Sequence, residues 1–96
     1  MLVLVAYDVA TVTAAGRRRL ARVAKACLDY GQRVQNSVFE CQIDAAQWTE
    51  LRHRLLGLID HETDSVRAYL LGNNWHGKVE HWGAKPSTDL EGPLLI

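Results

Sequence analysis

The chain opens with an uninterrupted apolar segment, Leu2–Ala6, which is followed by Tyr7 and Asp8. Apolar residues that succeed one another without alternation are typical of a strand covered on both faces. In a protein of 96 residues, helices can cover only one of these faces. The other face needs a partner, for which a second copy of the chain is the natural choice. The pattern predicts a buried first strand and favours a homodimer.

A helix is predicted to begin after Thr13, a good capping residue, and to run to about Tyr30. Its apolar positions recur at the helical spacing i, i+3, i+4, i+7 and i+8, and they are Leu20, Val23, Ala24, Cys27 and Leu28. The residues expected to point away from the core are Arg18, Arg22, Lys25 and Asp29. Gly31 suits the left-handed position that often follows a helix.

The segment Arg33–Ile43 is predicted to be extended, with a turn at Asn36-Ser37 that divides it into two strands. Asp44 should then cap a second helix, and Gln47 at its third position completes a capping box. The expected buried stripe of this second helix consists of Trp48, Leu51, Leu55, Leu58 and Ile59.

Two further strands are predicted at residues 65–71 and 78–83, separated by a break at Gly72-Asn73-Asn74. The predicted order is β-α-β-β-α-β with a short additional strand. Two helices alternating with strands in this order predict an α+β protein of ferredoxin-like type, with both helices on one face of the sheet. Residues 1–83 form the predicted domain, and residues 84–96 form an irregular tail.

The charges are balanced overall but unevenly distributed. Eleven basic and eleven acidic residues give a formal net charge of zero, so global charge gives no sign of nucleic acid. Five basic residues nevertheless fall within nine positions, and they are Arg17, Arg18, Arg19, Arg22 and Lys25. Most carboxylates lie further along the chain. The distribution therefore predicts a basic patch on a neutral body.

The cysteines and the apolar segments indicate the cellular environment. Cys27 and Cys41 lie in apolar segments without metal-ligand spacing, so we interpret them as buried, reduced thiols. The opening apolar run is too short for a signal peptide and lacks a basic flank. No apolar stretch is long enough to cross a membrane. A cytoplasmic protein is therefore expected.

Asp8 is the sharpest candidate for chemistry, because it follows a buried strand and opens the loop to the first helix. Functional side chains are often placed at the ends of rigid elements. Mg²⁺ can be held by one or two carboxylates, with waters and substrate phosphates as the other ligands. A two-fold axis nearby would bring two copies of Asp8 together. Position alone leaves open that Asp8 only caps a turn.

The basic helix face is the second candidate. Guanidinium groups bind phosphate in a bidentate fashion, so Arg18, Arg22 and Lys25 could follow a nucleic-acid backbone. An ordinary solvated helix face remains the alternative that the residues leave open.

Three segments resemble a known family: Val5–Val9 (VAYDV), Arg19–Lys25 (RLARVAK) and Tyr30–Cys41 (YGQRVQNSVFEC). The family is that of the small CRISPR-associated endonucleases, the second universal protein of CRISPR spacer acquisition. The resemblance covers residues 1–83, and the tail is not matched. Asn36 stands where many members carry tyrosine, a common departure.

The resemblance implies a ferredoxin-like homodimer that binds a divalent metal, usually Mg²⁺, at Asp8. It further implies metal-dependent cleavage of RNA or DNA in some members, and a dimer held by the CRISPR integrase that carries new spacer DNA. The residues linked by resemblance to the site or its support are Tyr7, Arg22, Arg33, Ser37 and Phe39. Arg19 belongs to the same basic helix.

Two functions follow. In the first, paired Asp8 residues hold Mg²⁺ in a slow nuclease, and Arg19, Arg22 and Arg33 position the phosphate. In the second, the dimer is a non-catalytic adaptor that holds spacer DNA between integrase subunits through sequence-independent phosphate contacts.

Overall fold

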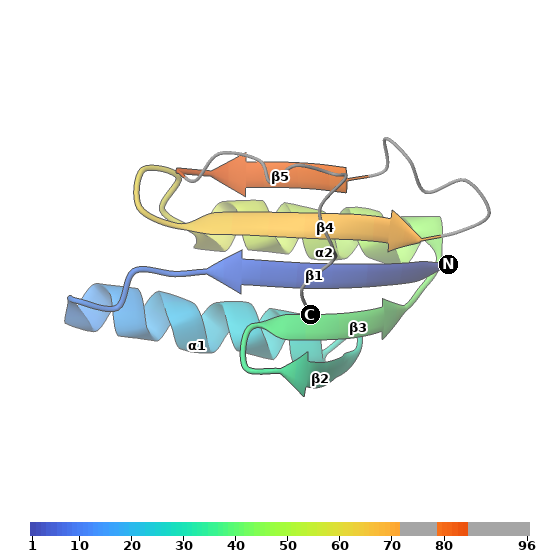
Figure 1. The fold of residues 1–96 in the computed structure, drawn as a ribbon, viewed down its shortest axis with the longest axis horizontal. Coiled ribbons are helices and arrows are strands. Elements are labelled where there is room, and N and C mark those ends of the chain that lie inside the picture. Colours follow the sequence, from blue (N-terminus) through green and yellow to red (C-terminus); the bar gives the residue numbers. More distant parts are fainter. Residues whose placement is uncertain (72–78, 85–96) are drawn as a thin grey trace.

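The computed structural model describes residues 1–71 and 79–84 of the chain. Figure 1 shows their order, and the elements are β1 (Leu2–Asp8), α1 (Ala14–Leu28), β2 (Gln32–Gln35), β3 (Val38–Gln42), α2 (Ala45–Leu58), β4 (Ser65–Leu71) and β5 (Val79–Gly83). The predicted tail from residue 85 and the predicted break at 72–74 lie outside the described residues. The predicted α+β element order is confirmed.

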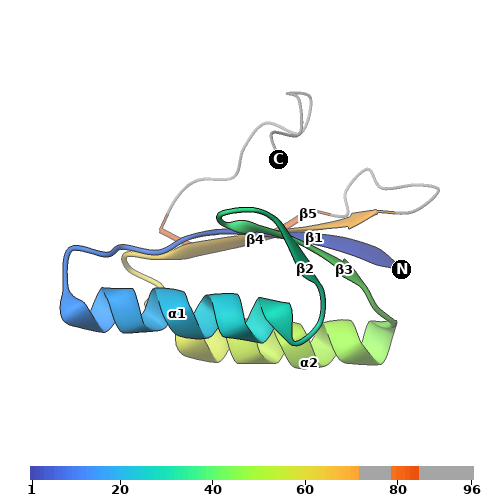
Figure 2. The same ribbon diagram turned by 90° about the horizontal axis from the view of Figure 1, so that it is seen from below.

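The strands in the part of the chain that the structure describes form one five-stranded sheet in the order β2-β3-β1-β4-β5, and all neighbouring strands are antiparallel. Figure 2 shows α1 and α2 side by side on the same face of this sheet. The first four strands and two helices have the ferredoxin-like arrangement, and β5 extends the sheet beyond β4. Among the described residues, no helix combines the length and the apolar character needed to cross a membrane.

Both helices begin at the predicted caps. The Gly16 backbone N–H donates to the Thr13 hydroxyl at 3.0 Å. At α2, the Gln47 backbone N–H donates to Asp44 Oδ1 at 2.7 Å, and the Asp44 backbone N–H donates to Gln47 Oε1 at 3.0 Å. These reciprocal bonds are the predicted capping box, and each cap is worth about 1 kcal/mol of stability.

The core lies between the sheet and the helices. Alternate residues of β1, namely Val3, Val5 and Tyr7, face the helices and are buried. Their partners from α2 are Trp48, Leu51 and Leu55, as the periodicity predicted. Leu58 is packed only partly. Trp82 from β5 completes this side, with its ring centre 6.4 Å from that of Trp48.

The opposite face of β1 carries Leu2, Leu4, Ala6 and Asp8. Leu4 is only 5% exposed within a single chain, and its direct neighbours across the sheet are Glu40 and Tyr69. Burial of Leu4 therefore requires no second copy of the chain. The homodimer that the apolar run favoured stays a prediction.

Two details of the first helix differ from prediction. Leu28 is 50% exposed, so it leaves the apolar stripe, and the buried Ala26 lies beside Cys27 instead. Gly31 is not left-handed, since Gly83 alone among the described residues has a positive φ. Position 31 requires glycine because it has no room for a side chain: a Cβ there would lie 2.3 Å from the Glu40 carbonyl oxygen.

Candidate functional site

Asp8 lies at the last position of β1 and is exposed. Because strand residues alternate, its carboxylate belongs to the face of the sheet that the helices do not cover. Its cross-strand neighbour on β4 is Ser65, which is buried. On the other side, the Tyr7 backbone N–H donates to the Ser37 carbonyl at 3.1 Å. The sheet thus holds Asp8 between the start of β4 and the β2–β3 turn.

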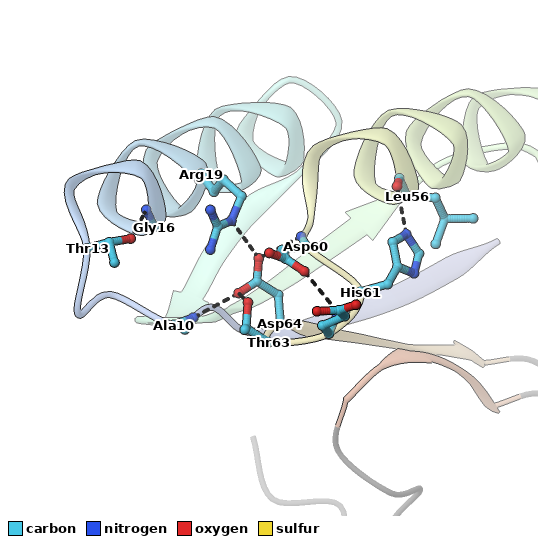
Figure 3. A network of polar contacts seen from close by, with 10 residues as sticks. Ala10, Thr13, Gly16, Arg19, Leu56, Asp60, His61, Thr63 and Asp64 are labelled. Atoms are coloured by element: carbon cyan, nitrogen blue, oxygen red, sulfur yellow. Dashed lines mark hydrogen bonds and ion pairs between the residues drawn. The ribbon is translucent and has the colours of Figure 1, made fainter.

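The loop that follows Asp8 is fixed at Ala10. Its backbone N–H donates to Asp64 Oδ1 at 3.0 Å, a bond drawn in Figure 3. Its carbonyl approaches Gly16 of α1 so closely that a Cβ on Gly16 would lie 2.0 Å from the oxygen. The end of β1 and the start of α1 are therefore joined to each other and to the segment before β4.

Asp64 is the centre of this polar network. Its side chain is fully buried, and Oδ2 accepts from Arg19 Nε at 2.8 Å and from the Asp60 backbone N–H at 2.9 Å. Oδ1 accepts from the Thr63 hydroxyl at 3.1 Å as well as from Ala10. Its backbone carbonyl accepts from the Ala84 N–H at 3.0 Å. Asp64 thus connects α1, the α2–β4 loop and the end of β5.

The pKa values of Asp64 and Arg19 reflect these hydrogen bonds. Burial by itself would raise the pKa of the Asp64 carboxyl, but the Arg19 guanidinium and the surrounding N–H and O–H donors lower it below its usual value. The same hydrogen bond raises the pKa of Arg19. The pattern of residues gave no sign of Asp64, because two of its four donors, Ala10 and Arg19, lie 54 and 45 residues away in the sequence.

Three of the predicted site residues form a stack under the sheet. The rings of Tyr7 and Phe39 are stacked with their centres 5.9 Å apart, and the Arg33 guanidinium lies 5.1 Å from the centre of the Phe39 ring. Burial, helped by Cys27 and opposed by Arg33, raises the pKa of Tyr7. Tyr7 and Phe39 therefore support the end of β1 from the helix side, whereas Asp8 belongs to the opposite face.

The predicted basic residues separate into two groups. Arg18, Arg22 and Lys25 are exposed on α1, on the side turned away from the sheet. Arg19 turns inward, and its Nε atom is engaged by Asp64. A single chain therefore places the outer basic residues on the helix layer and Asp8 on the open face of the sheet.

The described residues can be tested for a metal site. Within 1–71 and 79–84, no three His, Cys, Asp or Glu side chains lie together as a ligand set. Asp8 offers one exposed carboxylate, which suits a hard cation that keeps waters and substrate phosphates as its remaining ligands. The predicted two-carboxylate site would therefore need a second Asp8 from another chain, and it stays a prediction.

The fold and the site together define a small α+β protein with a ferredoxin-like sheet, an exposed carboxylate at the end of its first strand and a basic first helix. The family model described as CRISPR associated protein Cas2 matches residues 1–79. The chain belongs to this Cas2 family, which confirms the resemblance seen in its motifs.

Relatives match the full length of the chain, including residues 84–96. The "CRISPR-associated endoribonuclease Cas2" of Nitratidesulfovibrio vulgaris is 62% identical over 96 residues, which are 100% of this chain and 94% of that protein. The "CRISPR-associated endonuclease Cas2" of Halalkalibacterium halodurans is also 62% identical, with 100% of both chains covered. A crystal structure of Streptococcus pyogenes Cas2 is 61% identical, with a TM-score of 0.70 over 83% of this chain and 96% of that one.

Proposed function

We propose that this protein is a Mg²⁺-dependent nuclease of CRISPR adaptation, which acts as a homodimer on RNA or DNA phosphodiesters and joins the CRISPR integrase in spacer acquisition. The observation that carries the nuclease proposal is the exposed Asp8 carboxylate at the rigid end of β1. Relatives that match the full chain and are named as endoribonuclease or endonuclease support it.

In the proposed dimer, the open faces of two sheets approach each other and bring their Asp8 carboxylates together. A divalent cation bound there would activate a water molecule and neutralise charge on the attacked phosphate. Arg33 pairs with Phe39 across the strands and is exposed over its ring on the helix side of the sheet, so any phosphate that it contacts lies on the other face from Asp8 of the same chain. Tyr7 and Ser37 hold the end of β1 in place through the backbone bond between them.

The decisive variant is Asp8→Asn, which keeps the size of the side chain and removes its charge. Cleavage of labelled single-stranded RNA and duplex DNA would be measured with Mg²⁺ and with EDTA. We expect Asp8→Asn to slow cleavage by more than about 100-fold, because even outer-shell partners of a metal cost about 10- to 100-fold. Glu62→Gln, an exposed carboxylate in the α2–β4 loop, is the matched control and should cut normally.

Equal cleavage by Asp8→Asn and wild type, or cleavage that persists in EDTA, would refute the metal-dependent nuclease. Sedimentation of the wild-type protein tests the dimer separately, since a monomer at micromolar concentration contradicts the paired site.

A non-catalytic adaptor is the second candidate. The observation that favours it is the position of Arg18, Arg22 and Lys25 on the outer side of the helix layer, away from the face that holds Asp8. Such residues can hold a nucleic-acid backbone without contributing to cleavage. Spacer acquisition in cells that carry Asp8→Asn separates the candidates: acquisition should persist if the protein is an adaptor and fail if its cleavage is required.

A further inference from the structure

The face of the sheet that carries Asp8 is the one that the helices leave uncovered, and Figure 1 views the molecule onto this open face. Side chains alternate along a strand, so Asp8 shares the open face with Ala6. On the neighbouring strand β4, Ser65 lies opposite Asp8 and Arg67 lies opposite Ala6. On β5, His81 lies opposite Arg67. The register therefore places Arg67 and His81 on the same face as Asp8.

Arg67 is the only arginine or lysine that the register puts on the open face among the described strand residues. The other basic strand residue that the structure describes, Arg33, lies over the Phe39 ring on the helix side. Asp8 and Arg67 are diagonal neighbours across β1 and β4, and such residues lie about 7–8 Å apart, within reach of a long side chain. The basic helix predicted from the sequence offers no cation on this face of the same chain.

Two neighbours orient the Arg67 side chain, which is partly buried. Its Nη2 atom lies 3.3 Å from His81 Nδ1, and because a guanidinium can only donate, Nδ1 is the acceptor. Its Nη1 atom donates to the Tyr69 hydroxyl at 3.5 Å. A hydroxyl and an accepting imidazole nitrogen carry no charge, so these two contacts hold the guanidinium without cancelling its positive charge. Arg19 differs, because the buried Asp64 carboxylate balances its charge.

We propose that Arg67 binds a phosphate of the nucleic-acid substrate on the open face, next to the phosphate that a metal ion at Asp8 would hold. A guanidinium suits this role because its planar fork can donate two parallel N–H bonds to phosphate oxygens. In a dimer with paired Asp8 residues, each chain would contribute one Arg67 beside the pair. The inference deepens the proposed function and rests on it, since it requires the substrate to reach the face of Asp8.

Cleavage by Arg67 variants is the first test. Arg67→Gln removes the charge, and Arg67→Lys keeps the charge without the planar fork. Arg52→Gln makes the same chemical change in α2, on the helix side, where Arg52 Nη1 lies 3.7 Å from Glu80, and is the matched control. With Mg²⁺ and labelled single-stranded RNA and duplex DNA, Arg67→Gln should lower kcat/KM by about 10- to 100-fold, because a hydrogen bond to a charged group is lost. Arg67→Lys should be intermediate, and Arg52→Gln should cut normally.

The Mg²⁺ dependence separates binding of substrate from distortion of the site. A change that displaced Asp8 would raise the Mg²⁺ concentration needed for half of the maximal rate. Arg67 is not a metal ligand in this proposal, so Arg67→Gln should reach half of its own maximal rate at no more Mg²⁺ than wild type. A raised Mg²⁺ requirement would assign Arg67 a structural role and overturn the proposal.

Binding in EDTA tests Arg67 without any cleavage. The affinity of the full-length protein for a fluorescent single-stranded RNA would be measured by anisotropy at low salt. The Asp8 carboxylate repels a phosphate held by Arg67, so Asp8→Asn should raise the affinity by about two- to fivefold. In the double variant Asp8→Asn with Arg67→Gln, this gain should disappear, because Arg67 no longer brings a phosphate near residue 8.

Two results would overturn the proposal: cleavage by Arg67→Gln at the rate of Arg52→Gln, or an equal gain from Asp8→Asn with and without Arg67. Sedimentation of Arg67→Gln adds a third, since activity that returns to the wild-type rate once the variant is fully dimeric would show a role in assembly only. The proposed nuclease fails separately, if wild type does not cut or cuts in EDTA. The binding measurement in EDTA still decides the role of Arg67 in that case.

Discussion

Replacing Asp64 with asparagine should destabilise the protein strongly, although the two side chains have the same shape. Each carboxylate oxygen accepts two donors: Oδ1 from Ala10 and Thr63, and Oδ2 from Arg19 and Asp60. An amide has only one oxygen. Whichever way it is oriented, its NH₂ group faces two donors, and the charge that balances Arg19 is lost.

The magnitude follows from burial. The Asp64 side chain is fully buried, and breaking a buried ion pair from one side costs about 3–5 kcal/mol. Because the Arg19 side chain keeps 21% of its exposure, water can compensate part of the loss, so we expect about 3 kcal/mol for Asp64→Asn. A domain of this size has about 5–15 kcal/mol of total stability. The melting temperature should fall by about 12–24 °C.

The effect should depend on pH in a defined direction. The pKa of Asp64 is lower in the folded protein than the value of about 3.9 expected in the unfolded chain. Its contribution to stability is therefore complete above about pH 4 and is lost as pH falls toward the folded-state pKa. The difference between wild type and Asp64→Asn should be largest near pH 7 and should shrink at more acid pH.

Urea denaturation followed by circular dichroism at fixed protein concentration measures this difference, with Asp60→Asn as the control. Asp60 is an exposed residue whose Oδ1 accepts from the Glu62 N–H, a bond that asparagine can also accept, so a change below about 0.5 kcal/mol is expected. If Asp64→Asn loses no more stability than Asp60→Asn at pH 7, the buried ion pair does not hold the loops as described.

Three further predictions concern other parts of the fold. Gly83→Ala should cost more than about 3 kcal/mol in denaturation experiments, because φ is 114° there and a Cβ would lie 1.9 Å from the Asp64 carbonyl oxygen. Gly57→Ala, where a Cβ meets open space, should instead stabilise by about 0.5–1 kcal/mol, and a loss at both positions would contradict this account. Asp44→Ala should lower stability by about 1 kcal/mol because it removes the cap of α2, whereas Asp44→Ser should keep most of that stability. An unchanged urea midpoint for Asp44→Ala would exclude a stabilising cap. Burial raises the pKa of Cys27 to about 12 and that of Cys41 to about 11. A thiol reagent at pH 8 should therefore label both cysteines only after unfolding. Rapid labelling of the native protein would argue against their burial.

Local patterns in the sequence were sufficient to predict most of the elements. The apolar run of β1, the caps at Thr13 and Asp44, and the turn at Asn36-Ser37 act over a few residues, so each can be recognised without knowing the fold. The three motif segments, Val5–Val9, Arg19–Lys25 and Tyr30–Cys41, likewise gave the family, which the family model confirms. The role of Asp8 as a metal ligand remains a prediction that the Asp8→Asn experiment tests.

Features that join distant segments were decided by the tertiary structure. Arg19 looked like one more member of a basic patch, yet it meets a buried carboxylate 45 residues away. Gly31 looked like a residue that ends a helix. It must be glycine for a different reason, because β3 approaches this position too closely to leave room for a Cβ. Leu28 fits the helical period but is 50% exposed. The sequence determined which segments form helices and strands because those preferences are local. Which charges meet, which glycines are required and which apolar residues remain exposed depend on how the segments pack together.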